Sequence, residues 1–136
     1  MMSEMLEAYR GLVCSLGVLA SLMVIQILVV DFTSIRRKHV PGMPVTEGHD
    51  SFLFRAVRAH GNSNESLPTF ILIAVFAVAV QANPGWLNAL AMVFVAGRAG
   101  HMLCYYADLQ IGRSIAFGIG LLAMIGMLIV SVAATI

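Results

Sequence analysis

Four long apolar blocks divide this sequence and restrict what it can fold into. A helix needs about 20 mostly apolar residues to cross the hydrocarbon core of a bilayer. The second block reaches that length only when the polar stretch in front of it is included. We therefore expect an all-α fold, an integral membrane four-helix bundle. The blocks run from Gly11 to Val30, from Leu67 to Gln81, from Trp86 to Tyr106 and from Ile111 to Ile136.

The composition agrees with a membrane protein. Hydrophobic residues make up 60% of the 136 residues and charged residues only 11%, whereas a soluble domain is about half apolar and about a quarter charged. The first block is too long for the apolar part of a signal peptide, and Glu4 and Glu7 precede it where a signal peptide carries positive charge. We interpret it as a retained helix. The net charge of +1 and the absence of a basic tail indicate no nucleic-acid partner.

The blocks predict one domain over residues 1–136, with helices at about 8–38, 51–82, 84–107 and 111–135. Asn83 is suited to cap the third helix, and Pro84 is suited to its first turn. The stretch "HVPGMPVTEGHD" between the first two helices reads as a surface loop.

The distribution of Lys and Arg predicts the orientation. The first connection and its flanks are basic, the second connection has no Lys or Arg, and the third has Arg113. By the positive-inside rule the first and third connections are cytoplasmic and both termini lie outside. We expect a multi-pass protein of a bacterial inner membrane. The basic residues of the first connection are Arg36, Arg37, Lys38, Arg55 and Arg58.

Two polar stripes interrupt the apolar helices. At 100° per residue, the stripe on the second helix falls within an arc of about 80°, and the stripe on the third falls within about 60°. Ionisable side chains at membrane depth are costly and usually face the bundle interior or a wet cavity. The first stripe contains Arg55, Arg58, Asn62, Glu65 and Thr69, and the second contains Arg98, His101 and Tyr105.

A structural interpretation of the stripes competes with a functional one. Arg55 is expected to extend to the lipid headgroups, and Glu65 is expected to form an internal ion pair with Arg98 under either interpretation. One structural pair does not require the other polar residues around it. A surplus of cations beside one carboxylate indicates a site for an anionic ligand that also carries an amine.

Several other chemistries lack their motifs. A di-iron bundle needs Glu-x-x-His on paired helices, whereas here Asn62 is followed by Glu65 and Arg98 by His101. No CxxC motif or His/Cys cluster indicates a metal site. The sequence also has no GxSxG, Walker or HExxH motif.

The motifs of the polar stripes resemble those of a known family. "RAHGNSNE", from Arg58 to Glu65, is similar to the Arg-Ala-His/Gln-x-Asn-x-x-Glu signature of the MAPEG family, the membrane-associated proteins in eicosanoid and glutathione metabolism. "GRAGHMLCYY", with Arg98, His101 and Tyr105, and "IGRS", with Arg113 and Ser114, resemble the family's third-helix and fourth-helix motifs. The resemblance covers all four helices.

The resemblance implies a homotrimer that binds glutathione between neighbouring subunits on the cytoplasmic side. Arg58, Asn62 and Glu65 would hold the peptide backbone and charged ends of glutathione. His101 and Tyr105, with Arg98 beside them, would complete the wall of the site. Arg36 or Arg37 matches the family's first-helix arginine. In such an assembly Gly97, Gly100, Gly118 and Gly120 would allow close helix contacts.

The resemblance also implies the catalytic residues. A free thiol titrates near pH 8.5, and the thiolate is the nucleophile. Arg113, with Ser114, would lie by the sulfur, where a cation lowers the pKa of the thiol and holds the thiolate in place. A lipophilic second substrate would arrive from the bilayer.

Two departures from the family narrow the expected activity. Gly61 stands where prostaglandin-forming members carry a basic residue, and Ser66 stands where leukotriene-forming members carry tyrosine. We therefore expect conjugation of glutathione to a lipophilic electrophile, or reduction of a hydroperoxide. The alternatives are a small four-helix transporter that uses Glu65 as its ion site and a non-catalytic subunit with the MAPEG fold.

Overall fold

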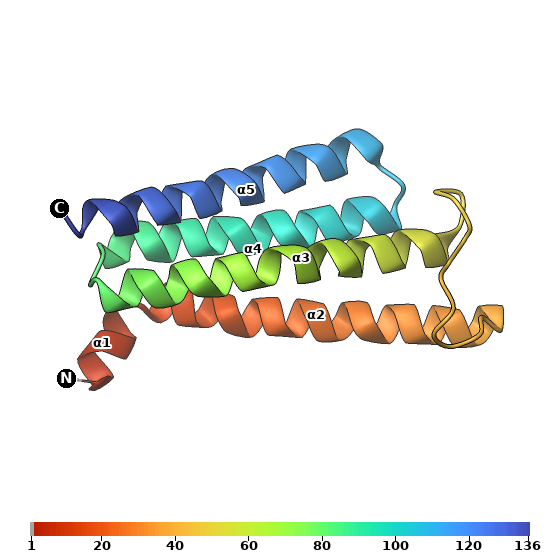
Figure 1. Ribbon diagram of the computed structural model, residues 1–136, viewed down its shortest axis with the longest axis horizontal. Coiled ribbons are helices and arrows are strands. Elements are labelled where there is room, and N and C mark those ends of the chain that lie inside the picture. Colours follow the sequence, from red (N-terminus) through yellow and green to blue (C-terminus); the bar gives the residue numbers. More distant parts are fainter. Residues whose placement is uncertain (1) are drawn as a thin grey trace.

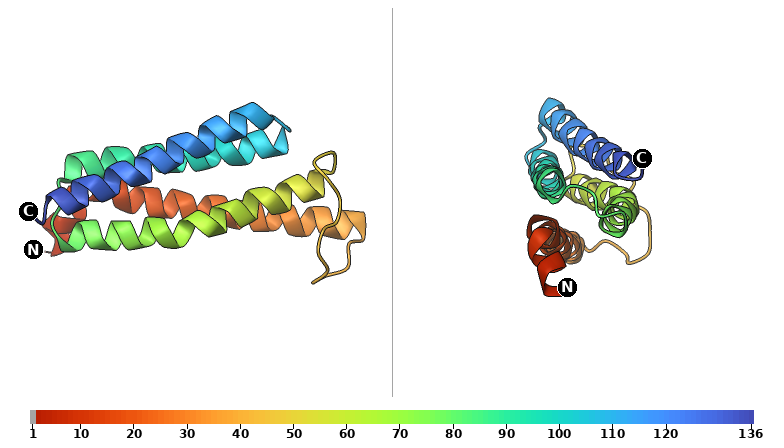
Figure 2. Two further views of the ribbon diagram at one scale, coloured as in Figure 1. Left: turned by 45° about the horizontal axis from the view of Figure 1, so that its top comes forward. Right: turned by 90° about the vertical axis from the view of Figure 1, so that its left-hand side faces the viewer.

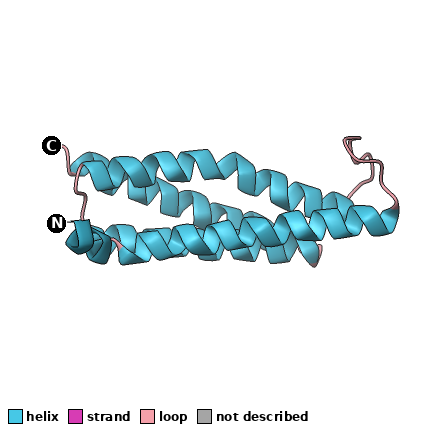
Figure 3. Ribbon diagram, turned by 90° about the horizontal axis from the view of Figure 1, so that it is seen from below, coloured by secondary structure: helices cyan, strands magenta, loops and turns pink. Residues whose placement is uncertain are grey.

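The computed structural model describes residues 2–136, and the regular structure in this range is entirely helical (Figures 1 and 3). A short helix, α1 (Met2–Ala8), precedes four long ones. The four long helices are long and apolar enough to cross a membrane. The prediction of an all-α integral membrane bundle is therefore confirmed. The long helices are α2 (Arg10–Arg37), α3 (Phe52–Ala79), α4 (Pro84–Tyr106) and α5 (Gln110–Ala133).

The four long helices differ in polarity in the way that the stripes predict. Mean hydropathy is 2.5 for α2 and 2.6 for α5, but only 1.2 for α3 and 1.3 for α4. The two less apolar helices carry the polar residues, and they lie next to each other in the middle of the bundle, with α2 and α5 on opposite sides (Figure 2). The bundle therefore places the polar stripes on its two central helices.

The two ends of the bundle carry different segments of the chain. Both chain termini and the α3–α4 turn lie at one end, and the α2–α3 loop and the α4–α5 turn lie at the other (Figure 1). Asn83 Oδ1 accepts a hydrogen bond from Trp86 N at 3.2 Å, and Pro84 is the first residue of α4. The predicted cap of this helix is confirmed. At the opposite end Ser51 Oγ accepts from Phe54 N at 3.5 Å and caps α3.

The core lies between all four long helices. Phe70 and Phe94 stack with ring centroids 4.3 Å apart and an interplanar angle of 10°. One turn beyond Phe94, a Cβ atom on Gly97 would lie 3.0 Å from Ala116 O and from Gly120 N. Gly97 and Gly120 thus permit a close approach of α4 and α5 within one subunit, whereas Gly118 has no neighbour within 4 Å there.

The break between α1 and α2 was not predicted. Asn88 of α4 holds both sides of the break: its Oδ1 accepts from Leu12 N at 2.9 Å and its Nδ2 donates to Ala8 O at 2.8 Å. The Tyr9 hydroxyl donates to Ala82 O at 2.8 Å. These bonds fix α1 and the start of α2 to the α3–α4 turn.

Candidate functional site

A polar pocket of about 250 Å³ lies at the end of the bundle that carries the α2–α3 loop. Residues of α3, α4 and α5 form its wall, because the polar stripes of α3 and α4 meet the start of α5 there. Most of the site residues predicted from the sequence are therefore brought together by the fold. The lining residues are Asn62, His101, Tyr105, Arg113, Ser114 and Phe117.

Arg98 lies behind this wall and ties it together. Its side chain is only 2% exposed, and its Nη2 donates to Asn62 Oδ1 at 2.8 Å and to Ser63 Oγ at 3.3 Å. Arg98 does not line the pocket itself. It contacts two residues that do, Asn62 of α3 and His101 of α4.

The contact between Arg98 and His101 assigns a role to the histidine. Arg98 Nη2 lies 3.4 Å from His101 Nδ1. A guanidinium has only donors, so this contact suits the tautomer in which Nδ1 carries no proton. The neutral ring then has its hydrogen on Nε2. His101 is 3% exposed and packs edge-on against Tyr105, with centroids 4.9 Å apart, which leaves Nε2–H as a hydrogen-bond donor for a ligand.

The predicted ion pair between Glu65 and Arg98 is wrong. Glu65 is exposed, and the guanidinium of Arg98 donates to Asn62 and Ser63 instead. The reason is angular: on a helix with 100° per residue, Ser63 lies about 100° from Asn62 in one direction and Glu65 about 60° in the other. Arg98 approaches from the side of Ser63. Glu65 and the exposed Arg58 therefore point out of the subunit.

Arg113 lies at the mouth of the pocket between the α2–α3 loop and α4. Its Nη1 is 3.1 Å from Nδ1 of His49, and its guanidinium carbon lies 4.7 Å from the centroid of the Tyr105 ring. Ser114, beside it, is exposed, and its hydroxyl donates to Gln110 O at 3.2 Å. A guanidinium and a hydroxyl thus lie next to each other at the opening.

Arg55 does not extend to the headgroups as expected. Its Nε donates to Tyr105 O at 3.0 Å, and its Nη1 donates to His49 O at 2.5 Å and to Asp50 O at 3.2 Å. The carbonyls at the end of α4 and in the loop offer Arg55 better partners within the subunit. Arg55 therefore fastens the α2–α3 loop to α4.

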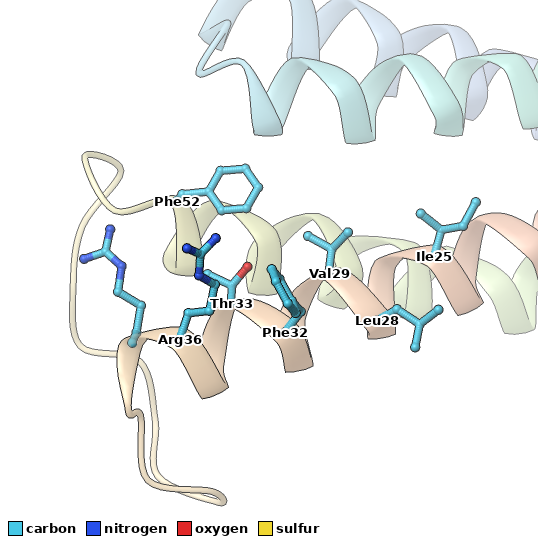
Figure 4. Close-up of a pocket in the computed structure, with 8 residues that line it drawn as sticks. Ile25, Leu28, Val29, Phe32, Thr33, Arg36 and Phe52 are labelled. Atoms are coloured by element: carbon cyan, nitrogen blue, oxygen red, sulfur yellow. The ribbon is translucent and has the colours of Figure 1, made fainter.

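Arg36 belongs to a different part of the surface. It lines a groove of about 860 Å³ on α2, together with Phe32, Thr33 and Phe52. Figure 4 shows Arg36 beside Thr33, with Phe52 of α3 across from them. The guanidinium of Arg36 lies 5.5 Å from the centroid of the Phe32 ring. A single subunit therefore does not bring Arg36, Arg58 or Glu65 into the polar pocket.

Three contributors to the site were missed in the sequence. Ser63 lies on the side of α3 that faces α4, outside the arc of the polar stripe, and there it accepts a hydrogen bond from Arg98. Phe117 follows Arg113 by four residues, and this helical spacing could have identified it. His49 lies in a loop, where no periodicity indicates which side chains turn inward.

The sequence matches the model of the MAPEG family over residues 12–133, which is nearly the whole chain. No curated protein matches the chain significantly. The matched range includes α3, α4 and α5, all of α2 except its first two residues, and every residue of the polar pocket.

Proposed function

This chain belongs to the MAPEG family, and from that premise we propose that it is a glutathione-dependent membrane enzyme. The reaction that we propose is transfer of glutathione to a lipophilic electrophile, with reduction of a hydroperoxide as the related activity. The observation that carries the proposal is the pocket that unites Asn62, His101, Tyr105, Arg113 and Ser114.

The chemistry of the pocket suits glutathione, which carries two carboxylates, one ammonium and one thiol. Arg113 supplies a cation at the opening, and Ser114 supplies a hydroxyl that donates to Gln110 O in the absence of a ligand. His101 supplies the Nε2–H donor inferred above, and Asn62 is held by Arg98. Glu65 is the carboxylate of the stripe that would receive the ammonium. The donors of the site outnumber its one carboxylate. This complements glutathione, which carries two carboxylates and one ammonium.

We propose that the complete site forms in a homotrimer, as the resemblance of the motifs implies. The pocket of one subunit is about 250 Å³, which lies below the range of about 300–1,000 Å³ that is typical of ligand sites. Arg58 and Glu65 are exposed on a helix that crosses the membrane, where lipid would be a costly neighbour. A neighbouring copy would cover these side chains and bring its Arg36 to the site.

The catalytic step follows from thiol chemistry. Arg113 would stabilise the thiolate by charge, and the Ser114 hydroxyl would turn from Gln110 O to donate a hydrogen bond to the sulfur. The thiol proton is lost to solvent. The sulfur then forms a bond to an electrophilic carbon as the leaving group departs with its electron pair. In hydroperoxide reduction, the thiolate attacks the terminal oxygen, the O–O bond breaks to release an alcohol, and a second glutathione yields the disulfide and water.

A direct experiment measures the ultraviolet absorbance of the thiolate when glutathione is added to the purified protein in detergent. We expect the absorbance to appear at a pH well below that for free glutathione, together with turnover of a generic aryl halide. If glutathione binds without thiolate formation, the chain is a non-catalytic member of the family. If glutathione does not bind, and Glu65→Gln abolishes proton-coupled transport in vesicles, the transporter alternative is correct.

A further inference from the structure

The end of the α2–α3 loop is folded against the mouth of the pocket. His49 is half-buried, although Gly48 and Asp50 on either side of it are exposed. Its ring is stacked over Tyr105, with centroids 6.4 Å apart and an interplanar angle of 24°, and meets Phe54 edge-on at 5.1 Å. The loop therefore delivers one imidazole to the site and leaves its neighbours in solvent.

The position of His49 is fixed through its backbone. Arg55 Nη1 donates to the carbonyls of His49 and Asp50, and Arg55 Nε donates to the carbonyl of Tyr105. The same side chain thus links the loop to the last turn of α4. Two residues after His49, Ser51 caps α3. These contacts hold the imidazole at one place relative to α4 and α5.

The imidazole takes part in positioning Arg113. Arg113 Nη1 lies 3.1 Å from His49 Nδ1, and since a guanidinium only donates, this nitrogen is the acceptor and carries no proton. The face of Tyr105 lies on the guanidinium at 4.7 Å. His49 and Tyr105 together restrict a side chain that would otherwise sample many rotamers, and the other N–H groups of Arg113 stay available to the pocket.

Groups from three helices surround the imidazole of His49. It faces Arg113 from α5, Tyr105 from α4, and Phe54 and Arg55 from α3. Asp50 is adjacent in the loop but contributes its carbonyl to Arg55. Within residues 2–136 no carboxylate forms an ion pair with the imidazole. The contact of Arg113 with the loop is therefore made to the ring nitrogen Nδ1 of His49.

We propose that His49 is a positioning residue: its unprotonated Nδ1 aligns the guanidinium of Arg113 on the sulfur of glutathione. The inference rests on the proposed function and adds a loop residue to it. A positioning residue changes the rate of the chemical step more than it changes binding, because the ends of glutathione are held by other side chains.

Two substitutions distinguish the effect of the hydrogen-bond acceptor of His49 from the effect of its ring stacking. His49→Phe keeps the stacking on Tyr105 and removes the acceptor. His49→Asn removes the ring and keeps an oxygen acceptor near the position of Nδ1. Both are tested in the full chain, in the same detergent, by glutathione thiolate absorbance against pH and by turnover of an aryl halide. Melting temperatures and oligomeric masses show whether each variant is folded.

For His49→Phe we expect kcat to fall by about 10-fold or more, with the KM for glutathione within about twofold of wild type. The apparent pKa of the bound glutathione thiol should rise by about one pH unit, which corresponds to a 10-fold loss of thiolate. His49→Asn should restore most of kcat and of the thiolate titration.

Two results would overturn the inference while leaving the proposed function intact. The first is a wild-type thiolate titration and kcat in His49→Phe. The second is a loss in His49→Asn as large as that in His49→Phe, because the ring rather than the acceptor would then matter. Failure of the wild-type protein to form thiolate would instead contradict the proposed function, and the inference with it.

Discussion

Arg113 is the residue on which the proposed chemistry depends most. It lies in the first turn of α5, which is otherwise uncharged, and a cation at a helix N-terminus is unfavourable for the helix dipole. Its contacts with His49 and Tyr105 hold it at the pocket instead. We predict that Arg113→Leu lowers kcat by about 10²-fold, the scale for removing one charge-stabilising donor. Glutathione affinity should change little. Turnover and calorimetric binding check this, and unchanged kcat would remove Arg113 from the catalytic residues.

Glu65 supports a second prediction at the same scale. Because hydrogen bonds to charged groups contribute about 1.5–3 kcal/mol, Glu65→Gln should weaken glutathione binding by about 10-fold or more. Contacts within one subunit predict no change in melting temperature, since Glu65 is exposed there and Arg98 donates to Asn62. Isothermal titration and thermal unfolding measure the two effects. Wild-type affinity would exclude Glu65 from the site, and a large loss of stability would indicate a buried partner.

The sequence predicted some residues of the site better than others. Arg98, His101 and Tyr105 could be found because one helix places them on one face, and all three are buried in the structure. The partner of Arg98 could not be found, because the choice between Asn62 and Glu65 depends on the side from which α4 approaches α3. Contacts between elements are decided by packing, which helical periodicity does not describe.

At the scale of helices, the contact between α4 and α5 gives a matched pair of substitutions. A Cβ on Gly97 would lie 3.0 Å from backbone atoms of α5, whereas a Cβ on Gly100, one turn later, would meet only the Ala116 side chain at 3.5 Å. Gly97→Ala should destabilise the fold by about 1–3 kcal/mol. Gly100→Ala should be neutral or stabilising by up to about 1 kcal/mol. Thermal unfolding in one detergent compares them, and equal melting temperatures would contradict the close packing.

The elements themselves were predictable to the extent that local signals define them. Apolar length predicted the four long helices, and Asn83 with Pro84 predicted the start of α4. The separation of α1 from α2 depends on hydrogen bonds from Asn88, which is distant in the sequence. No local signal in the first residues of the chain could have indicated those bonds.

For the whole molecule, the proposed trimer makes a prediction about mass. Arg58 and Glu65 face outward in one subunit, and the polar pocket, at about 250 Å³, is smaller than typical ligand sites of about 300–1,000 Å³. Native mass spectrometry in mild detergent should therefore find three copies, with glutathione bound to the trimer. A stable monomer that binds glutathione with full affinity would rule out a shared site.

The orientation of the bundle is a further prediction at this scale. Both termini lie at the end opposite the pocket (Figure 1), and the basic first connection lies at the end of the pocket. The positive-inside rule then predicts a cytoplasmic pocket and external termini. Reporter domains fused to the C-terminus and inserted into the α2–α3 loop should report opposite sides. The reverse assignment would place the site outside the cell.

A structure of the assembled protein determined with glutathione tests the central claim most directly. We predict ligand density at a boundary between copies, with its sulfur beside Arg113 and Ser114 and its ammonium beside Glu65. An arginine from α2 of a neighbouring copy should contact the same ligand. Density at another location, or a clear map of this pocket without density at saturating glutathione, would contradict the account.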